Sequence, residues 1–150
     1  MRRLLPFLQL VFATTFIFSQ NVSAVWKLAP EANAMWVGPF DPTITGVYDG
    51  GWWANDEAAV TDRACYFDDE YRLHPDGTFE NVMDGETWLE TWQGVTEEGC
   101  GEPVAPHDGS NAATWAYDDL TGVLTLEGEG AYLGLPKVVN AGELSSDTPP

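Results

Sequence analysis

A short alternation of apolar and polar residues that ends in a strong turn signal sets the strictest limit on this fold. In residues 65–83, CYFDDEYRLHPDGTFENVM, every second residue of the first nine is predicted to face the same side of a strand. The residues predicted to share one face are Cys65, Phe67, Asp69, Tyr71 and Leu73. Residues 75–77, Pro-Asp-Gly, predict a turn, because proline fixes one dihedral angle and glycine tolerates positive φ. Phe79 then returns opposite Leu73, so the stretch predicts an antiparallel hairpin.

A second hairpin is predicted within residues 113–135, ATWAYDDLTGVLTLEGEGAYLGL. Trp115 and Tyr117 alternate with small or polar residues, residues 118–122 supply the turn, and Leu124 and Leu126 alternate on the return. Long segments with helical periodicity are missing from the sequence, so we expect an all-β fold, an antiparallel barrel or sandwich. Only about five or six strands are predicted, fewer than a closed barrel usually has, which suggests that C-terminal strands are missing.

The N-terminal residues have the pattern of a secretory signal peptide. Arg2 and Arg3 precede an apolar run over residues 4–18, and residues 22–24, Val-Ser-Ala, form a small-residue cleavage pattern. The apolar run is shorter than the roughly 20 residues of a membrane span, which disfavours the alternative of a membrane anchor. We therefore expect a secreted protein, periplasmic or extracellular. The predicted organisation is a signal peptide at 1–24, a β domain at 25–143 and a polar tail at 144–150.

The chain has only two cysteines, Cys65 and Cys100. In an oxidising compartment a disulfide is their default state, so we predict that they pair. The two histidines have no close ligand spacing around them, and the sequence does not predict a zinc site.

The strong excess of acid limits the partners that the protein can have. The chain has 24 acidic and 6 basic residues, and loss of Arg2 and Arg3 with the leader would move its formal net charge from −18 to −20. Such a field repels nucleic acid and anionic membranes but leaves neutral ligands unaffected. The alternative is that the charge serves only solubility.

Two adjacent tryptophans suggest how a neutral ligand would bind. In an extended chain Trp52 and Trp53 point to opposite faces, so one of them is expected to lie outside the core. An exposed indole offers a flat face for the C–H face of a sugar ring, and its N–H supplies one hydrogen bond. The alternative is that every tryptophan packs in the core or over a sheet edge. The candidate ligand-binding residues are Trp52, Trp53, Asn55, Trp88, Trp92 and Gln93.

Catalytic patterns in the sequence are weak. Glu86 and Glu90 are the best-placed carboxylate pair for glycoside hydrolysis, but so many acids make such pairs common by chance. A triad from His107, Asp108 and Ser110 would need neighbours in sequence to adopt a geometry that they rarely reach. We therefore expect no catalytic residues and no enzyme activity.

Residues 68–70, Asp-Asp-Glu, form an acidic run, although neighbours on a strand point to opposite faces. No cofactor is expected. Calcium is the metal that the charge density would suit, and no set of metal ligands can be named.

Four strings carry a resemblance to a known kind of module: VWKLAPEANAMWVGP, GGWWANDEAAVTDRACYFDDEYRLHPDGTFENVMDGETWLETWQG, GCGEPVAPHDGSNAATWAYDD and GAYLGLPKVVNAGEL. Together they resemble an accessory β module of secreted polysaccharide-degrading proteins of marine bacteria, including laminarinase-like glycoside hydrolases. YRLHPDGTF and ATWAYDDLTGVLTLEG are also similar to a lipocalin-type barrel, although Trp26 lacks the usual preceding Gly-x. The laminarinase-like pattern Glu-x-Asp-x-x-Glu does not occur, and further strands would follow GEL in the module.

The resemblance implies a noncatalytic role near polysaccharides. Combined with the tryptophans and the acidic charge, it leads us to expect a secreted carbohydrate-binding module for a neutral glucan-type polysaccharide. The alternative is a structural or spacer module that packs against a neighbouring catalytic domain or protein and has no ligand of its own.

Overall fold

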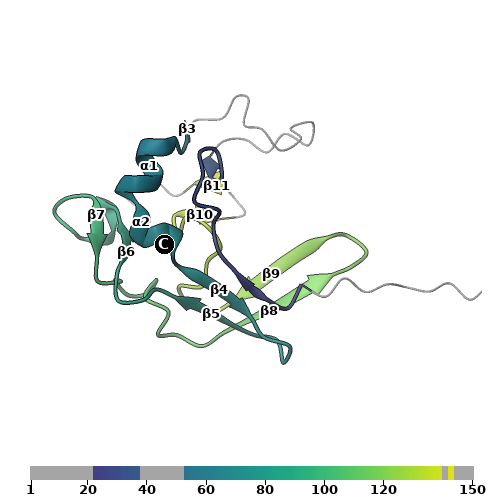
Figure 1. Cartoon of the computed structure of the whole chain (residues 1–150). Helices are drawn as coiled ribbons and strands as arrows, with labels where there is room; N and C mark the ends of the chain where they lie inside the picture. The colour runs from purple at the N-terminus through teal and green to yellow at the C-terminus, as the bar shows by residue number, and fades with distance from the viewer. Residues whose placement is uncertain (1–21, 38–52, 140–141, 144–150) are drawn as a thin grey trace, which may run out of the picture.

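A five-stranded antiparallel sheet organises the protein in the computed structural model, which describes residues 22–37, 53–139 and 142–143 (Figure 1). The strand order is β1-β4-β5-β8-β9. The strands are β1 (Val25–Trp26), β4 (Glu70–Leu73), β5 (Thr78–Val82), β8 (Ala113–Asp118) and β9 (Val123–Glu127). The predicted leader up to residue 21, the predicted tail at 144–150 and Trp52 lie outside the described residues.

Three small two-stranded pairings and three short helices complete the described structure. The pairings are β2 (Trp36–Val37) with β3 (Trp53–Ala54), β6 (Thr87–Leu89) with β7 (Gly99–Gly101), and β10 (Val138–Val139) with β11 (Gly142–Glu143). The helices are α1 (Glu57–Asp62), α2 (Ala64–Phe67) and the 3₁₀-helix η1 (Thr91–Gln93). In Figure 1 the β8–β9 hairpin extends to one side, while α1, α2 and the β6–β7 hairpin gather at the other.

Both predicted hairpins are present, and the first has the predicted register. Leu73 lies opposite Phe79 in the β4–β5 hairpin, and Trp115 lies opposite Leu126 in the β8–β9 hairpin. Partners across an antiparallel pair point to the same face. One face of the sheet is therefore apolar. It carries Trp26, Tyr71, Leu73, Phe79, Trp115, Tyr117, Leu124 and Leu126.

The prediction that the strand begins at Cys65 is wrong. Residues 57–67 form α1 and α2, and the strand begins only at Glu70. The side chain of Asp56 caps α1 by accepting a hydrogen bond from the amide of Ala59 at 2.8 Å. Residues 65–67 are all buried, which a strand with one solvent-facing side cannot achieve but a helical turn between two layers can.

The core has two clusters of buried side chains. The first lies on the apolar face of the sheet and contains Tyr71, Leu73, Phe79 and Tyr132. The second contains Met35, Tyr66 and Leu135 and lies beside the helices. The segment that follows β9 supplies Tyr132 to the first cluster and Leu135 to the second, so it joins the two parts of the core.

The fold is mostly β and antiparallel, with few short helices, and a sandwich-like arrangement is consistent with it. The closed barrel that we considered is not formed by the described residues, because β1 and β9 each have a neighbour on one side only in the sheet. None of the helices in the described ranges is long and apolar enough to cross a membrane.

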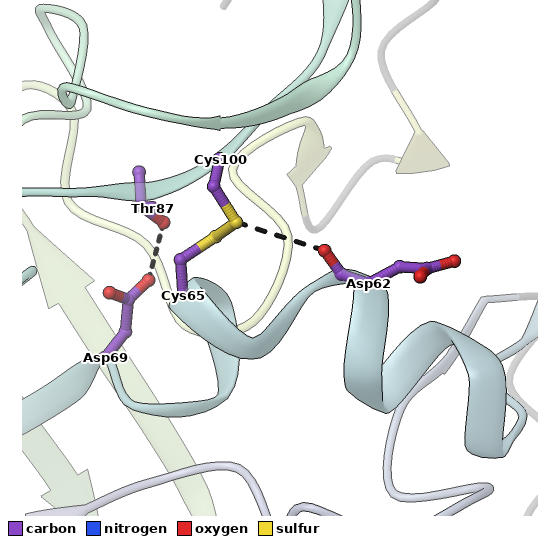
Figure 2. Close-up of a disulfide and its surroundings, with 5 residues drawn as sticks. All are labelled: Asp62, Cys65, Asp69, Thr87 and Cys100. Atoms are coloured by element: carbon purple, nitrogen blue, oxygen red, sulfur yellow. Dashed lines mark hydrogen bonds between the residues drawn. A yellow bond between two sulfur atoms is a disulfide. The ribbon is translucent and has the colours of Figure 1, made fainter.

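The predicted disulfide is confirmed. Cys65 of α2 is bonded to Cys100 of β7, with 6.0 Å between the Cα atoms (Figure 2). The sulfur of Cys100 also lies 3.9 Å from the carbonyl oxygen of Asp62. A disulfide sulfur has no proton to donate, so this is a packing contact. The disulfide ties the β6–β7 hairpin to α2.

Candidate functional site

Two of the candidate tryptophans lie close to one guanidinium group. The Arg63 guanidinium carbon is 4.9 Å from the ring centroid of Trp53 and 4.4 Å from that of Trp88. Both distances are within the range of cation–π attraction, which is strongest for tryptophan. Residues 35 positions apart in sequence are thereby held together by a third side chain. We call Trp53, Arg63 and Trp88 the indole–arginine stack.

The local structure explains how the stack forms. Arg63 lies at the junction where α1 ends and α2 begins, Trp53 lies in β3 just before α1, and Trp88 lies in β6. The disulfide holds the β6–β7 hairpin against α2, which keeps Trp88 within reach of Arg63. All three side chains are partly exposed, so the stack lies at the surface.

Trp53 and Trp88 also contribute to packing. Both indoles lie against the second core cluster of Met35, Tyr66 and Leu135. The indole N–H of Trp88 is buried and has no hydrogen-bond partner. An unpaired buried donor costs free energy, so Trp88 is held here by packing and by Arg63.

Trp92 and Gln93, two further candidate residues, lie in η1, which follows β6 in the chain. The Trp92 indole N–H donates to a carboxylate oxygen of Glu90 at 2.7 Å, and the ammonium of Lys137 is 2.9 Å from the same carboxylate. The amide of Glu90 donates to the side-chain oxygen of Gln93 at 2.9 Å, which closes a capping box. Trp92 is partly exposed, and its ring centroid lies 5.6 Å from that of His107.

Asn55 does not fit its predicted role at the ligand surface. Its side chain is 1% exposed. Its oxygen accepts from the amide of Met35 at 2.8 Å, and its nitrogen donates to the carbonyl oxygen of Glu31 at 2.8 Å. The amide group is therefore used to join the segment before β2 to β3, and it offers no surface to a ligand.

Asp69 is a buried carboxyl that we did not predict as a special residue. Its side chain is 2% exposed, one oxygen accepts from the hydroxyl of Thr87 at 2.6 Å, and the other has no hydrogen-bond partner (Figure 2). Burial raises the pKa of Asp69 to about 7. The sequence signal was the alternation that placed Asp69 on the same face as Tyr71 and Leu73. That face is buried.

The residues that were weak catalytic candidates in the sequence make other contacts in the structure. Glu86 is exposed, whereas Glu90 pairs with Lys137. Asp108 accepts from both the amide and the hydroxyl of Ser110, at 3.0 and 2.6 Å, in a local turn. His107 is buried against Trp92 and Tyr132, and burial lowers its pKa.

The acidic run at residues 68–70 is divided by the fold. Asp68 is exposed, Asp69 is buried, and Glu70 is paired with Lys27 and Arg72 at 3.1 and 2.6 Å. Within the described residues no group of three or more His, Cys, Asp or Glu side chains is placed to hold a metal ion.

Comparisons with protein-family models, with curated proteins and with solved structures find no match to this chain. The function must therefore be argued from the residues and their geometry.

Proposed function

We propose that the protein is a secreted, noncatalytic module that binds a neutral glucan-type polysaccharide through the indole–arginine stack, together with Trp92 and Gln93. The observation that carries the proposal is the position of Arg63, 4.9 and 4.4 Å from two partly exposed indole rings. The proposal includes a lipocalin-like origin for the sheet, in line with the resemblance of its two hairpin sequences.

The stack has the chemistry that a neutral sugar needs. The indole rings are large, flat and polarisable, and their surfaces suit the C–H faces of a pyranose ring. A guanidinium presents several N–H donors in one plane, which suit sugar hydroxyls. Because Arg63 already orders both rings, little side-chain entropy is lost on binding. The net charge of −18 favours a neutral chain over a sulfated or uronic acid one.

Titration with laminarin, followed by tryptophan fluorescence, tests the proposal. A saturable spectral shift is expected for the wild type, with a loss of about tenfold or more in affinity for Trp88→Ala, since aromatic anchors dominate such surfaces. Trp26→Phe is the matched control, because it removes another partly exposed indole that is outside the stack. A flat response from folded wild-type protein, with or without calcium and with other neutral β-glucans, would contradict the proposal.

The second candidate is a spacer module that packs against a neighbouring catalytic domain. The observation that favours it is the packing of Trp53 and Trp88 on Met35, Tyr66 and Leu135. Quenching of tryptophan fluorescence by acrylamide separates the two candidates, and a neutral quencher avoids repulsion by the acidic protein. If Trp53→Phe and Trp88→Phe leave the quenched fraction unchanged, the two rings are inaccessible and the spacer role is favoured.

A further inference from the structure

The buried carboxyl group of Asp69 is one of the attachments of the β6–β7 hairpin. One of its oxygens accepts a hydrogen bond from the hydroxyl of Thr87, the first residue of β6, at 2.6 Å (Figure 2). The other oxygen is buried and has no hydrogen-bond partner. Asp69 and Thr87 are 2% and 4% exposed, so the bond between them is shielded from bulk solvent. The hairpin is therefore attached to a carboxyl group that uses only one of its two oxygens.

Thr87 is the neighbour of Trp88, one ring of the indole–arginine stack. Successive residues of a strand point to opposite faces, so Thr87 points toward Asp69 and Trp88 points to the other side of β6. There the Trp88 ring centroid lies 4.4 Å from the Arg63 guanidinium carbon. The indole N–H of Trp88 makes no hydrogen bond that would hold the ring in place. A movement of β6 at Thr87 would therefore move Trp88 relative to Arg63.

The ionisable groups around Asp69 disfavour a charge on it. Asp68, which precedes it, and Asp84, which follows β5, both oppose that charge, whereas Lys27, which follows β1, favours it. The ammonium of Lys27 is already 3.1 Å from a carboxylate oxygen of Glu70. Burial raises the pKa of three nearby tyrosines, from α2, β4 and the segment after β9, which are Tyr66, Tyr71 and Tyr132. These tyrosines stay neutral between pH 5 and pH 8.

An ionised Asp69 is better solvated by water than by this buried site. A carboxylate can accept hydrogen bonds at both oxygens, and here only Thr87 donates one. Burial raises the pKa of Asp69 from 3.8 to about 7. Because the pKa is raised in the closed form, that form is favoured fully below about pH 4 and loses this advantage as the pH rises through 7. Water reaches the second oxygen only if β6 moves away.

We propose that the hydrogen bond between Thr87 and Asp69 is a pH-sensitive latch, which holds β6 in place when Asp69 is protonated and releases it when Asp69 is ionised. The proton passes to water as β6 opens, and Trp88 then moves away from Arg63. The disulfide at Cys100 keeps β7 on α2, so the hairpin stays attached in the open form. The effect on glucan binding rests on the proposed function, but the release of β6 does not require a ligand.

Hydrogen exchange of the hairpin amides tests the latch without a ligand. Protection factors, which correct for the intrinsic pH dependence of exchange, are measured for residues 87–89 and 99–101 at pH 5 and pH 8. In the wild type they should fall about tenfold or more at the higher pH, and in Asp69→Asn they should stay the same. Glu86→Gln removes an exposed carboxyl next to Thr87 and should behave as the wild type does.

The urea dependence of this exchange separates the latch from unfolding of the whole protein. A local opening exposes little surface, so the fall in protection should be the same with and without about 1 M urea. Protection that does not depend on pH would overturn the proposal. Exchange that depends on pH only through a urea-sensitive opening would overturn it as well, because Asp69 would then act through global unfolding.

Laminarin titrations at pH 5 and pH 8 test the link to binding. The affinity of the wild type should fall about fivefold or more at the higher pH, whereas Asp69→Asn should bind equally at both. If the wild type binds laminarin at neither pH, the proposed function fails, and hydrogen exchange still decides whether the latch exists. A wild type that binds with the same affinity at both pH values would overturn the link between the latch and the stack.

Thr87→Val replaces Asp69→Asn if that variant does not fold. The change keeps the shape of the side chain and removes the donor, so an ionised Asp69 loses its only hydrogen bond. Hydrogen bonds to charged groups are stronger than those to neutral ones. Relative to the wild type, hairpin protection should therefore fall at least about threefold more at pH 8 than at pH 5. An equal fall at both pH values would overturn the proposal.

Discussion

Asp69 is a carboxyl in surroundings that favour its protonated form. It is 2% exposed, and one of its oxygens has no hydrogen-bond partner. Desolvation is the largest cause of its raised pKa; nearby Asp68 and Asp84 raise it further, and the hydrogen bond from Thr87 and the charge of Lys27 lower it. Removing such a carboxyl from water costs less when it is neutral, so the stability of the fold depends on pH at this residue.

The wild type should lose stability as the pH rises from 5 to 8, and Asp69→Asn should not. The folded pKa is about 7 and the usual value is 3.8, so this contribution is fully present below about pH 4 and is lost as the pH rises through 7. The expected loss between pH 5 and pH 8 is about 2 to 3 kcal/mol, measured by urea unfolding of both proteins.

The difference between the two proteins isolates Asp69 from other titrating groups. Burial lowers the pKa of His107, so its contribution has the opposite sign and falls as the pH decreases below about 6.5, but it is common to both proteins. Glu86→Gln is the control, because it removes an exposed acid and should keep the wild-type pH dependence. Equal pH dependence in Asp69→Asn and the wild type would show that Asp69 ionises freely in the fold.

At the scale of elements, the disulfide from Cys65 to Cys100 and the hydrogen bond from Thr87 to Asp69 attach the β6–β7 hairpin to the rest of the protein, in addition to the packing of Trp88 (Figure 2). Trp88 of this hairpin can reach Arg63 only while the hairpin stays in place. The hairpin attachment therefore connects the stability of the fold with the geometry of the proposed site.

Removing the disulfide should destabilise the protein by about 2 to 4 kcal/mol. The bond closes a loop with a sequence separation of 35, for which the chain-entropy model gives about 4 kcal/mol as an upper value. The double variant Cys65→Ala with Cys100→Ala should show this loss in urea unfolding, and reduced wild-type protein should match it. If oxidised and reduced wild type unfold at the same urea concentration, packing alone holds the hairpin.

The segment that follows β9 depends on a glycine at one close approach. Gly130 has a φ of +74°, and a Cβ at this position would lie 1.7 Å from the carbonyl oxygen of Pro106. Gly85 has a φ of +99°, but no atom lies within 4 Å of the position of its Cβ. A side chain at either glycine would therefore strain the backbone. Only at Gly130 would its Cβ also clash with a neighbouring atom.

Gly130→Ala should cost more than about 3 kcal/mol or prevent folding, whereas Gly85→Ala should cost about 1 to 2 kcal/mol from strain alone. Thermal unfolding of the two variants measures the difference. Similar midpoints would mean that the segment moves away from Pro106 without cost, and that it is less rigid than the contacts indicate.

The sequence predicts local elements better than contacts between distant ones. The β4–β5 and β8–β9 hairpins could be predicted because alternation and turn residues are local signals. The helices at 57–67 were missed, because a short capped helix has too few turns to show its period. The role of Asn55 depends on partners 20 and 24 residues away, and the stack depends on Arg63 lying close to two tryptophan rings. Contacts between residues so far apart in the chain cannot be predicted from sequence spacing.

At the scale of the whole molecule, repulsion between acidic groups opposes the compact state. The chain has 24 acidic residues and 6 basic ones. Some acids are neutralised locally, as Glu70 is by Lys27 and Arg72 and Glu90 is by Lys137. The cations are too few to pair with most of the carboxylates, so the unpaired acids repel one another more strongly in the fold than in the expanded chain.

Added salt should therefore stabilise the protein. Between about 0.02 and 0.5 M NaCl the screening length falls from about 20 Å to about 4 Å, which removes most repulsion between exposed acids. Screening also weakens the exposed ion pairs, but such pairs contribute little, so we expect a net gain on the order of 1 kcal/mol in the free energy of unfolding. Urea unfolding at pH 7 in the two salt concentrations measures this change in the free energy of unfolding.

Chloride is the suitable anion, because sulfate would strengthen apolar burial regardless of charge. A loss of stability in salt would mean that the pairs around Glu70 and Glu90 outweigh the repulsion, and that the acidic surface is an ordered network of charges.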